Sequence, residues 1–184
     1  WFGHVFRVPD GVGPASLRLG QWETKGTVQF DAARITAAIP VHRPVGKLLL
    51  GEGESIRGGK YTFAGTFSHP GTNFHRTLAS AAASFNSDRW CFGGGAQTTY
   101  RFGLPGCPFT SGEISFTVNY RTAGGAVAEL SRDGAAWREV AVQNKVGTAK
   151  AAVPAAWLPA ETIWLRIRAA APESNFQVKE IRFE

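Results

Sequence analysis

The side chains best suited to chemistry lie in one Gly-rich stretch, from Asn73 to Arg101. A sugar site needs an aromatic face for the apolar side of the ring and a few polar side chains for the hydroxyls. Together, five residues of this stretch supply an aromatic face and polar groups: His75, Asn86, Asp88, Arg89 and Trp90. Trp157, beside Leu158-Pro159, is a second candidate platform. The alternative is that Trp90 is a core residue on a strand that begins at Arg89.

No catalytic motif accompanies these residues. The histidines His4, His42, His69 and His75 match no zinc-enzyme spacing, and the sequence lacks Gly-x-Ser-x-Gly, His-Glu-x-x-His and a phosphate-binding Gly loop. Asp88 or Glu113 could meet another acid in the fold, which leaves a carboxylate pair for glycoside hydrolysis open. The residues favour a protein that is not an enzyme and requires no cofactor, without deciding the point.

The two cysteines, Cys91 and Cys107, enclose a Gly-rich loop. In an exported protein they predict one disulfide, which would stabilise the fold by about 3 kcal/mol through loop closure. The alternative is two free thiols. A disulfide here would also order the loop that follows the candidate sugar ligands.

The chain is moderately basic, with a formal net charge of +6 and a pI near 9.7. Its Lys and Arg residues are scattered, with no block of five or more, so we expect no nucleic-acid partner. An acidic polysaccharide or a cell envelope suits this charge equally well. No run of 18 apolar residues occurs, so no membrane-spanning helix is expected.

The elements that must position these side chains are strands, because the dominant period of apolar residues is two. Alternation runs through Tyr61–Phe67, Ile114–Tyr120 and Ile163–Ile167, and the turns between are rich in Gly, Pro, Asn and Asp. Only Thr77–Phe85 approaches a helical spacing, and its alanines could equally lie in a loop. The sequence predicts an all-β fold, an antiparallel sandwich of the jelly-roll kind.

One apolar pattern occurs twice, at a constant offset of 148 residues. The first copy consists of Leu17, Leu19, Val28, Phe30, Ala33 and Ile35, and the second of Leu165, Ile167, Phe176, Val178, Ile181 and Phe183. Both copies slip phase at the same place, after Phe30 and after Val178. Such a slip predicts a β-bulge, since a one-residue shift would otherwise turn the apolar set to the wrong face.

This repeat predicts a domain boundary in Pro40–Lys47, with residues 45–184 forming one sandwich domain. Residues 1–44 would then be a partial sandwich or linker that packs on the main domain, on an adjacent domain or on a partner chain. The alternative is one large sandwich of all 184 residues. Because the chain lacks Met and begins at Trp1, we expect a processed product or part of a longer protein.

Two segments carry a resemblance to known proteins. Ser131–Trp137 reads Ser-x-Asp-Gly-x-x-Trp, with Asp133-Gly134 predicting a type I′ turn, and Leu158–Glu184 places a Leu-Pro loop before two apolar strands. Both resemble the galactose-binding-like, carbohydrate-binding-module jelly rolls, and the hairpin is also similar to the Asp-box turns of sialidases, where it is structural. In these modules an early acidic residue often helps to hold calcium, so the resemblance implies a structural calcium site at Glu52 and Glu54.

The resemblance implies a non-catalytic carbohydrate-binding accessory module of a larger secreted or cell-envelope protein, with a polysaccharide or glycan as its partner. The expected location is extracellular or in the cell envelope. One alternative is a structural or assembly domain that mediates protein–protein contacts. The other is a polysaccharide-active enzyme.

Overall fold

The computed structural model describes residues 8, 19–20, 25–38, 43–67, 73–86 and 88–184. Regular structure in this part of the chain is almost entirely β. The strands, in chain order, are β1 (Arg43–Val45), β2 (Leu48–Leu50), β3 (Glu54–Arg57), β4 (Lys60–Thr66), β5 (Leu78–Ala81), β6 (Ser84–Phe85), β7 (Trp90–Phe92), β8 (Gln97–Gly103), β9 (Glu113–Ala123), β10 (Ala126–Ser131), β11 (Arg138–Gln143), β12 (Gly147–Ala152), β13 (Thr162–Ala169) and β14 (Asn175–Phe183). One 3₁₀ turn, η1 (Ala155–Trp157), lies between β12 and β13.

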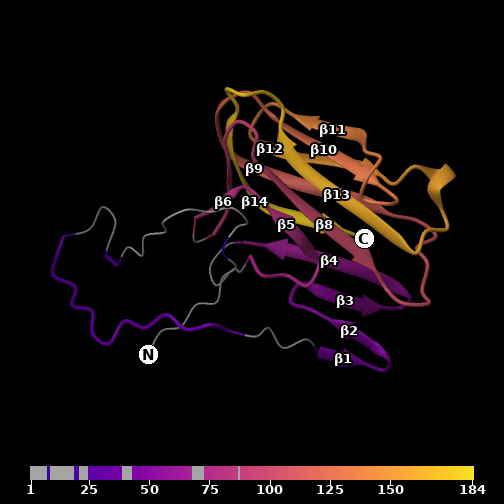
Figure 1. The fold of residues 1–184 in the computed structure, drawn as a ribbon, viewed down its shortest axis with the longest axis horizontal. Helices are drawn as coiled ribbons and strands as arrows, with labels where there is room; N and C mark the ends of the chain where they lie inside the picture. Colours follow the sequence, from indigo (N-terminus) through magenta and orange to yellow (C-terminus); the bar gives the residue numbers. More distant parts are fainter. Residues whose placement is uncertain (1–7, 9–18, 21–24, 39–42, 68–72, 87) are drawn as a thin grey trace.

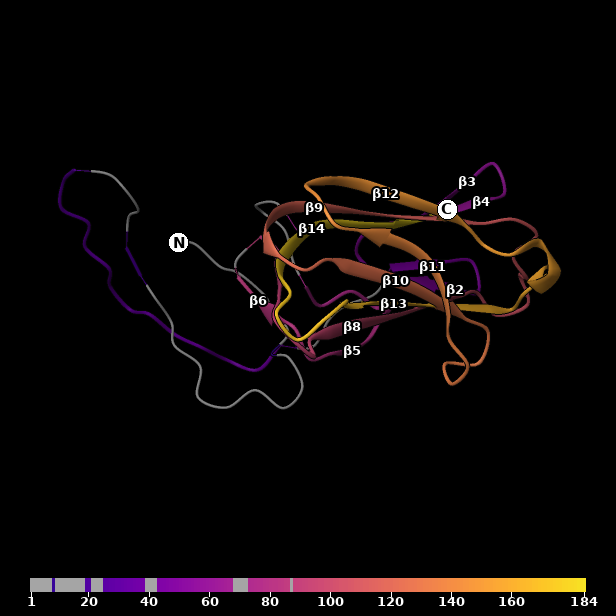
Figure 2. The ribbon, with the colours of Figure 1, turned by 90° about the horizontal axis from the view of Figure 1, so that it is seen from above.

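Two antiparallel sheets face each other. The five-stranded sheet has the order β11-β10-β13-β8-β5, and the seven-stranded sheet has the order β12-β9-β14-β4-β3, with β7 also pairing to β14 and β6 to β7. Hairpin β1–β2 forms a small sheet of its own (Figure 1). The layers are separate when the molecule is seen from above, with β12, β9 and β14 in one and β13, β8 and β5 in the other (Figure 2). The predicted antiparallel β-sandwich is confirmed.

The alternation of apolar residues decides which side of each strand faces the core. In β13, Ile163, Leu165 and Ile167 are fully buried, whereas the residues between them are half-buried on the outer face. β9 follows the same rule through Val118 and then departs from it, because Tyr120 is 47% exposed. Gln177 pairs with Tyr120 and Val178 with Val118, so Asn119 is passed over and the phase of the strand changes. The prediction that Tyr120 continues the buried set is therefore wrong.

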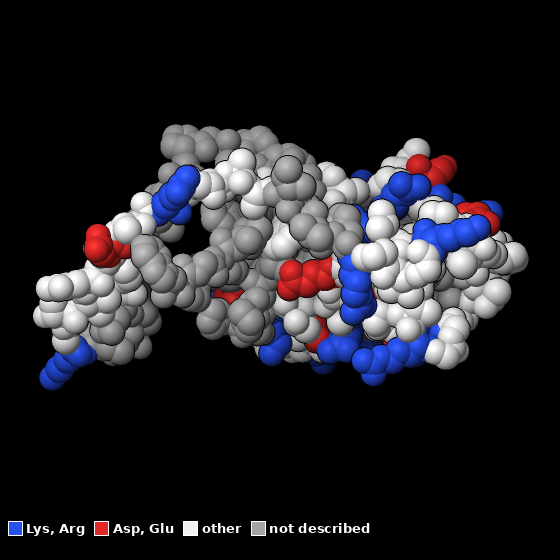
Figure 3. All heavy atoms as spheres, turned by 90° about the horizontal axis from the view of Figure 1, so that it is seen from below, with Lys and Arg blue, Asp and Glu red and all other residues white. Residues whose placement is uncertain are grey.

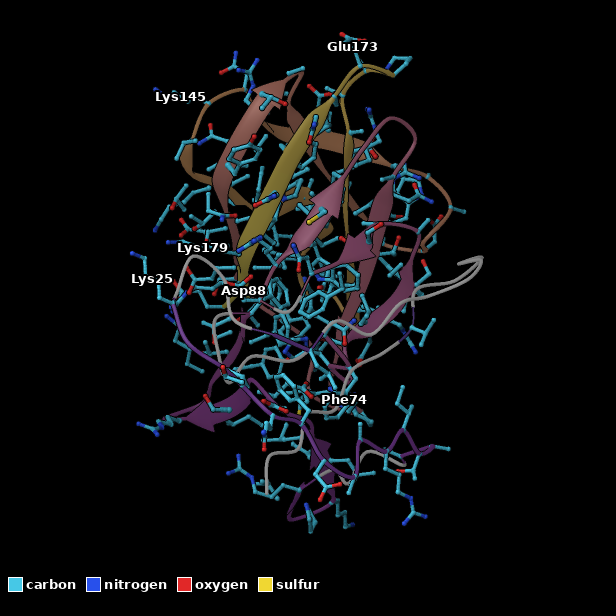
Figure 4. The ribbon with its side chains drawn as sticks, turned by 90° about the vertical axis from the view of Figure 1, so that its left-hand side faces the viewer. Lys25, Phe74, Asp88, Lys145, Glu173 and Lys179 are labelled. Atoms are coloured by element: carbon cyan, nitrogen blue, oxygen red, sulfur yellow. The ribbon has the colours of Figure 1, made fainter. Side chains whose placement is uncertain are left out.

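Aromatic rings hold the two sheets together. Phe102 of β8 stacks on Phe183 of β14 across the sandwich, with ring centroids 4.5 Å apart. Phe92 of β7 stacks on Phe176 of β14 at 4.7 Å within one sheet, where the two residues are cross-strand partners. Figure 4 shows such rings gathered between the sheets. Offset stacks of this kind add about 1 kcal/mol each beyond the area that they bury.

The slip predicted within the last strand is present. Val178 pairs with Val118 and Glu180 with Thr117, so Lys179 has no partner in β9 and forms a bulge (Lys179 is labelled in Figure 4). The bulge lets Phe176, Val178, Ile181 and Phe183 all face the core, each with 0% exposure. The local strand prediction from Phe176 onward is confirmed.

The corresponding N-terminal residues have a different environment. Residues 25–38 form no strand and run outside the sandwich in both views (Figures 1 and 2). The predicted boundary near residue 44, and the packing of residues 1–44 on another domain or chain, stay predictions; most of residues 1–24 and 39–42 lie outside the described part.

Two local predictions differ from the structure. Gly134 has a positive φ of 76° but Asp133 does not, and six residues separate β10 from β11, so the connection is not a two-residue type I′ turn. Side-chain oxygens of Ser131 and Asp133 hold it instead, through bonds from the N–H groups of Gly134 (2.9 Å), Ala135 (2.8 Å) and Ala136 (2.9 Å). The stretch that approached a helical spacing forms β5 and β6, because its backbone pairs with β8 and β7.

Candidate functional site

Two of the predicted sugar ligands belong to the core. Trp90 is 0% exposed, packs edge-on against Phe85, and donates from Nε1 to the hydroxyl of Tyr100 at 3.0 Å. His75 is 5% exposed between the rings of Phe63 and Phe67. Burial lowers the pKa of His75 to about 4, so its imidazole is neutral at physiological pH. The prediction that Trp90 and His75 contact a ligand is wrong, since neither ring reaches the surface.

The other predicted ligands lie apart from one another. Asn86, Asp88 and Arg89 form the turn between β6 and β7, where Arg89 pairs with Asp88 at 2.8 Å. Trp157 is in η1, half-buried against the core. β6 and η1 lie at opposite ends of the sandwich in Figures 1 and 2, so these residues do not form one site.

The predicted disulfide is absent, because Cys91 and Cys107 are both free thiols. Cys91 pairs with Gln177 near the start of β14, whereas Cys107 lines the same pocket as Glu184, just beyond the end of β14. Seven residues of strand span about 23 Å, and a disulfide needs Cα atoms within about 7 Å. The expectation of a stapled loop is therefore corrected. Burial raises the pKa of the Cys91 thiol, which lowers the fraction of reactive thiolate at neutral pH.

Glu54 has a structural role that conflicts with the implied calcium site. Its Oε2 accepts from the Gly51 N–H (2.6 Å) and from Arg76 Nε (2.7 Å), and its Oε1 accepts from the Tyr61 hydroxyl (2.6 Å) and from Arg76 Nη2. Burial raises the pKa of this carboxyl, but the bonds from Arg76, Tyr61 and Gly51 together outweigh it and hold the pKa low. Arg76 already supplies the positive charge that a cation would bring.

These residues do not fit a calcium ion. Calcium takes six to eight oxygens, and both oxygens of Glu54 are occupied by donors. Glu52 is exposed in the neighbouring turn, and the described residues hold no group of three His, Cys, Asp or Glu side chains suited to a metal.

The side chains that do gather at the surface lie on the outer face of the five-stranded sheet. Because Ile163, Leu165 and Ile167 of β13 point inward, the alternate residues Trp164, Arg166 and Arg168 must point outward. Each has cross-strand neighbours of the same orientation: Ser131, Glu129 and Val127 on β10, and Arg101, Thr99 and Gln97 on β8. Apart from Val127, these residues form one continuous row of polar and aromatic groups.

In one half of this row the charged side chains pair with one another. Glu129 accepts from Arg166 Nε at 2.6 Å and pairs with Arg168 at 3.1 Å. The guanidinium of Arg166 also lies over the ring of Trp137, 4.3 Å from its centroid. The charges and the ring face are thus used within the protein, which indicates a structural role for this half.

In the other half of the row the charged side chain, Arg101, has no carboxylate partner among the described residues. Arg101 is exposed, lies over the ring of Trp164 at 5.5 Å, and forms no ion pair with any described residue. A pocket of about 580 Å³ begins at this pair, and its polar lining includes Arg76, Thr77, Glu161 and Thr162. Arg76 is fixed by Glu54, so this wall of the pocket is rigid. We call Trp164, Arg101, Glu161 and Thr162, with the pocket beside them, the outer-face site.

The turn of Ser131 and Asp133 supports this site. A Cβ added at Gly134 would lie 3.2 Å from the ring of Trp164, so the backbone of the turn contacts that ring directly. Only glycine combines this approach with a φ of 76° at low cost. The hairpin therefore positions Trp164, in agreement with its predicted structural role.

A second pocket, of about 740 Å³, contains two neighbouring carboxylates. Glu113 and Glu184 exchange backbone hydrogen bonds of 2.8 and 3.0 Å across β9 and the end of β14, and both line this pocket. Each pairs with a lysine, Glu113 with Lys150 and Glu184 with Lys60. A glycosidase needs one carboxylic acid with a raised pKa, whereas Lys60 lowers the pKa of Glu184. Glu184 therefore does not have the electrostatics of a catalytic acid.

Charge on one face of the molecule is dispersed (Figure 3). Lys and Arg side chains occupy several separate places on the face drawn in Figure 3, with Asp and Glu side chains among them. Within the described residues, no helix is long and apolar enough to span a membrane.

Comparison with known proteins assigns this chain to no family. No protein family matches this sequence, and no curated protein does. One solved structure, a family GH115 4-O-methyl-α-glucuronidase with specificity for decorated arabinogalactans, aligns with a TM-score of 0.42 and 15% identity. The alignment covers 59% of this chain and 16% of the glucuronidase.

Sequence reasoning missed Trp164 and did not select Arg101, yet a signal for Trp164 was available. Trp164 lies between Ile163 and Leu165 in sequence, on the polar face of the strand rather than on the apolar face that Ile163, Leu165 and Ile167 share. A tryptophan on the solvent face of a strand is not needed by the core, which marks it as a candidate contact residue.

Proposed function

We propose that this protein is a non-catalytic carbohydrate-binding β-sandwich and that it binds its glycan at the outer-face site. The observation that carries the proposal is the Trp164–Arg101 pair at the mouth of the 580 Å³ pocket. The half-buried indole of Trp164, beside the guanidinium of Arg101, offers its exposed part as apolar surface to a sugar ring, while Arg101, Glu161 and Thr162 offer donors and acceptors for hydroxyls.

Rigidity supports the same proposal. The site is built on paired strands β8 and β13 rather than on a long loop, and the Trp164 ring is supported by the Gly134 turn. Side chains fixed in this way lose little conformational entropy on binding, which favours affinity. We further propose that the protein acts outside the cell or in its envelope, as an accessory part of a larger protein.

Affinity electrophoresis through gels that contain soluble polysaccharides tests the proposal. A panel of neutral and acidic polysaccharides should include at least one that retards the wild-type chain. Trp164→Ala should abolish the retardation, and Arg101→Ala should weaken it, with circular dichroism spectra unchanged. Arg101→Lys should restore binding in part if the charge alone matters.

Trp157→Ala is the matched control, because Trp157 is also half-buried but lies at the end of the sandwich. It should leave retardation unchanged. Loss of binding in Trp157→Ala but not in Trp164→Ala would contradict the outer-face site while leaving carbohydrate binding in place. No retardation by any member of the panel would contradict the proposed function itself.

A further inference from the structure

We infer that residues 28–35 are a β-strand of a second sandwich of this same fold, equivalent to β14, and that the strands beside which they pack come before them in the natural polypeptide. The inference concerns assembly between domains and does not depend on carbohydrate binding.

The first support is sequence equivalence with a strand whose packing is known. Residues 28–35 read Val-Gln-Phe-Asp-Ala-Ala-Arg-Ile, and residues 176–183 read Phe-Gln-Val-Lys-Glu-Ile-Arg-Phe. Apolar residues match at all four core positions, and the glutamine and the arginine between them are identical. The phase slip falls at the same place, Asp31 matching the bulge residue Lys179.

The second support is the contrast in burial. In β14 the four apolar residues are 0% exposed, whereas Val28, Phe30 and Ile35 are 39%, 51% and 70% exposed. A soluble protein seldom leaves several large apolar side chains of one strand uncovered.

The topology identifies the partner. β14 lies in the middle of its sheet, between β9 on one side and β4 and β7 on the other. A strand with the same pattern therefore needs neighbours on both edges and a core beneath it. In this fold all of those neighbours precede β14 in sequence, so the equivalent neighbours of residues 28–35 are expected to precede Val28.

A second copy of this chain cannot supply a vacant position of this kind in its sheet. Its own β14 already occupies the position, with backbone pairing to β4, β7 and β9. Residues 28–35 could enter only by displacing β14 and the side chains that it buries. The fitting partner is a sandwich that lacks its own last strand.

Hydrogen–deuterium exchange compares the chain of residues 1–184 with the natural polypeptide that contains it. Amides of residues 28–35 should exchange rapidly in the shorter chain and at least 100-fold more slowly in the natural polypeptide, approaching residues 176–183. Rapid exchange of residues 28–35 in both would overturn the inference, as would a natural polypeptide with no sandwich-sized sequence before Val28. Self-association of residues 1–184 that protects these amides would also overturn it, in favour of a second copy.

A matched pair of variants supplies an independent readout. In the natural polypeptide, Phe30→Asp should lower the melting temperature of the preceding domain, because Phe30 matches the buried Val178. Gln29→Asp, on the opposite side of the strand, should leave it unchanged. Neither variant should alter the unfolding of residues 43–184. Equal effects of the two substitutions would contradict a one-sided, buried strand.

Discussion

Acidification should destabilise this fold through one buried histidine, His75. The imidazole is held among aromatic rings, and its Nδ1 has no hydrogen-bond partner among the described residues. Burial lowers its pKa from 6.5 to about 4, although the nearby charge of Glu54 acts in the opposite direction. Between these two pKa values the unfolded chain binds a proton and the folded chain does not, so stability must fall as the pH falls.

The size of the effect follows from the two pKa values. A shift of about 2.5 units, at about 1.4 kcal/mol per unit, limits the loss to about 3.4 kcal/mol at low pH. Linkage predicts a loss of about 2 kcal/mol by pH 5 and about 3 kcal/mol near pH 4. Above about pH 7.5 His75 is neutral in both states, and its contribution is constant.

Urea unfolding of the wild type and of His75→Leu at pH 4, 5, 6 and 7 measures this loss. The variant removes the titrating group and keeps an apolar side chain, so other ionisations common to both chains cancel in the difference. The free energy of unfolding of the wild type, minus that of the variant, should fall by about 2 kcal/mol from pH 7 to pH 5. A difference that stays constant within about 0.5 kcal/mol would refute the reasoning. So would a His75 pKa near 6.5 measured by NMR in the folded protein.

Three further predictions concern stability and the thiols. Glu54→Gln should destabilise the fold by about 2–3 kcal/mol in chemical denaturation at pH 7, because it leaves the half-buried guanidinium of Arg76 without its counter-ion; Glu52→Gln, in the exposed turn, should change little. Gly124→Ala should lower the free energy of unfolding by at least about 2 kcal/mol more than Gly58→Ala does. Both glycines have a φ near 60°, but only the new Cβ at Gly124 would lie 2.2 Å from Ser174 Oγ. Thiol titration of the unfolded, unreduced protein should find two free thiols per chain, and a value near zero would contradict the separation of Cys91 from Cys107.

The sandwich was predictable because alternation is a local property that the core enforces. Ile163, Leu165 and Ile167 must share a face whatever their neighbours are, so β13 could be placed from its own residues. Tyr120 was not predictable in the same way. The change of phase at Asn119 depends on how β9 pairs with β14, and that pairing is not encoded within β9 alone.

The predicted ligand residues do not form one site, because residues close in sequence were assumed to be close in space. Trp90 follows Arg89 directly, but Arg89 belongs to the turn before β7, whereas Trp90 begins β7 and faces inward because β7 pairs with β14. The chain between Cys91 and Cys107 includes the whole of β8, which carries the second thiol toward the other end of the sandwich. Glu54 offered a plausible calcium ligand until its partner Arg76, 22 residues away, was placed beside it.

The chain contains its own test of how far a local pattern determines structure. Residues 28–35 and 176–183 share apolar spacing, polar matches and a phase slip. The apolar side chains of residues 176–183 are fully buried in β14, whereas residues 28–35 have exposed apolar side chains and no strand partner in the described chain. The difference must lie outside the segments, in the presence of β4, β7 and β9 on either side of β14. An isolated strand cannot satisfy its backbone or cover its apolar face, so the pattern specifies what a segment can join and not that it will fold alone. By the same reasoning, residues 28–35 should become a strand only when the matching edges are supplied, and for this reason their exchange rate in the longer polypeptide is the decisive measurement.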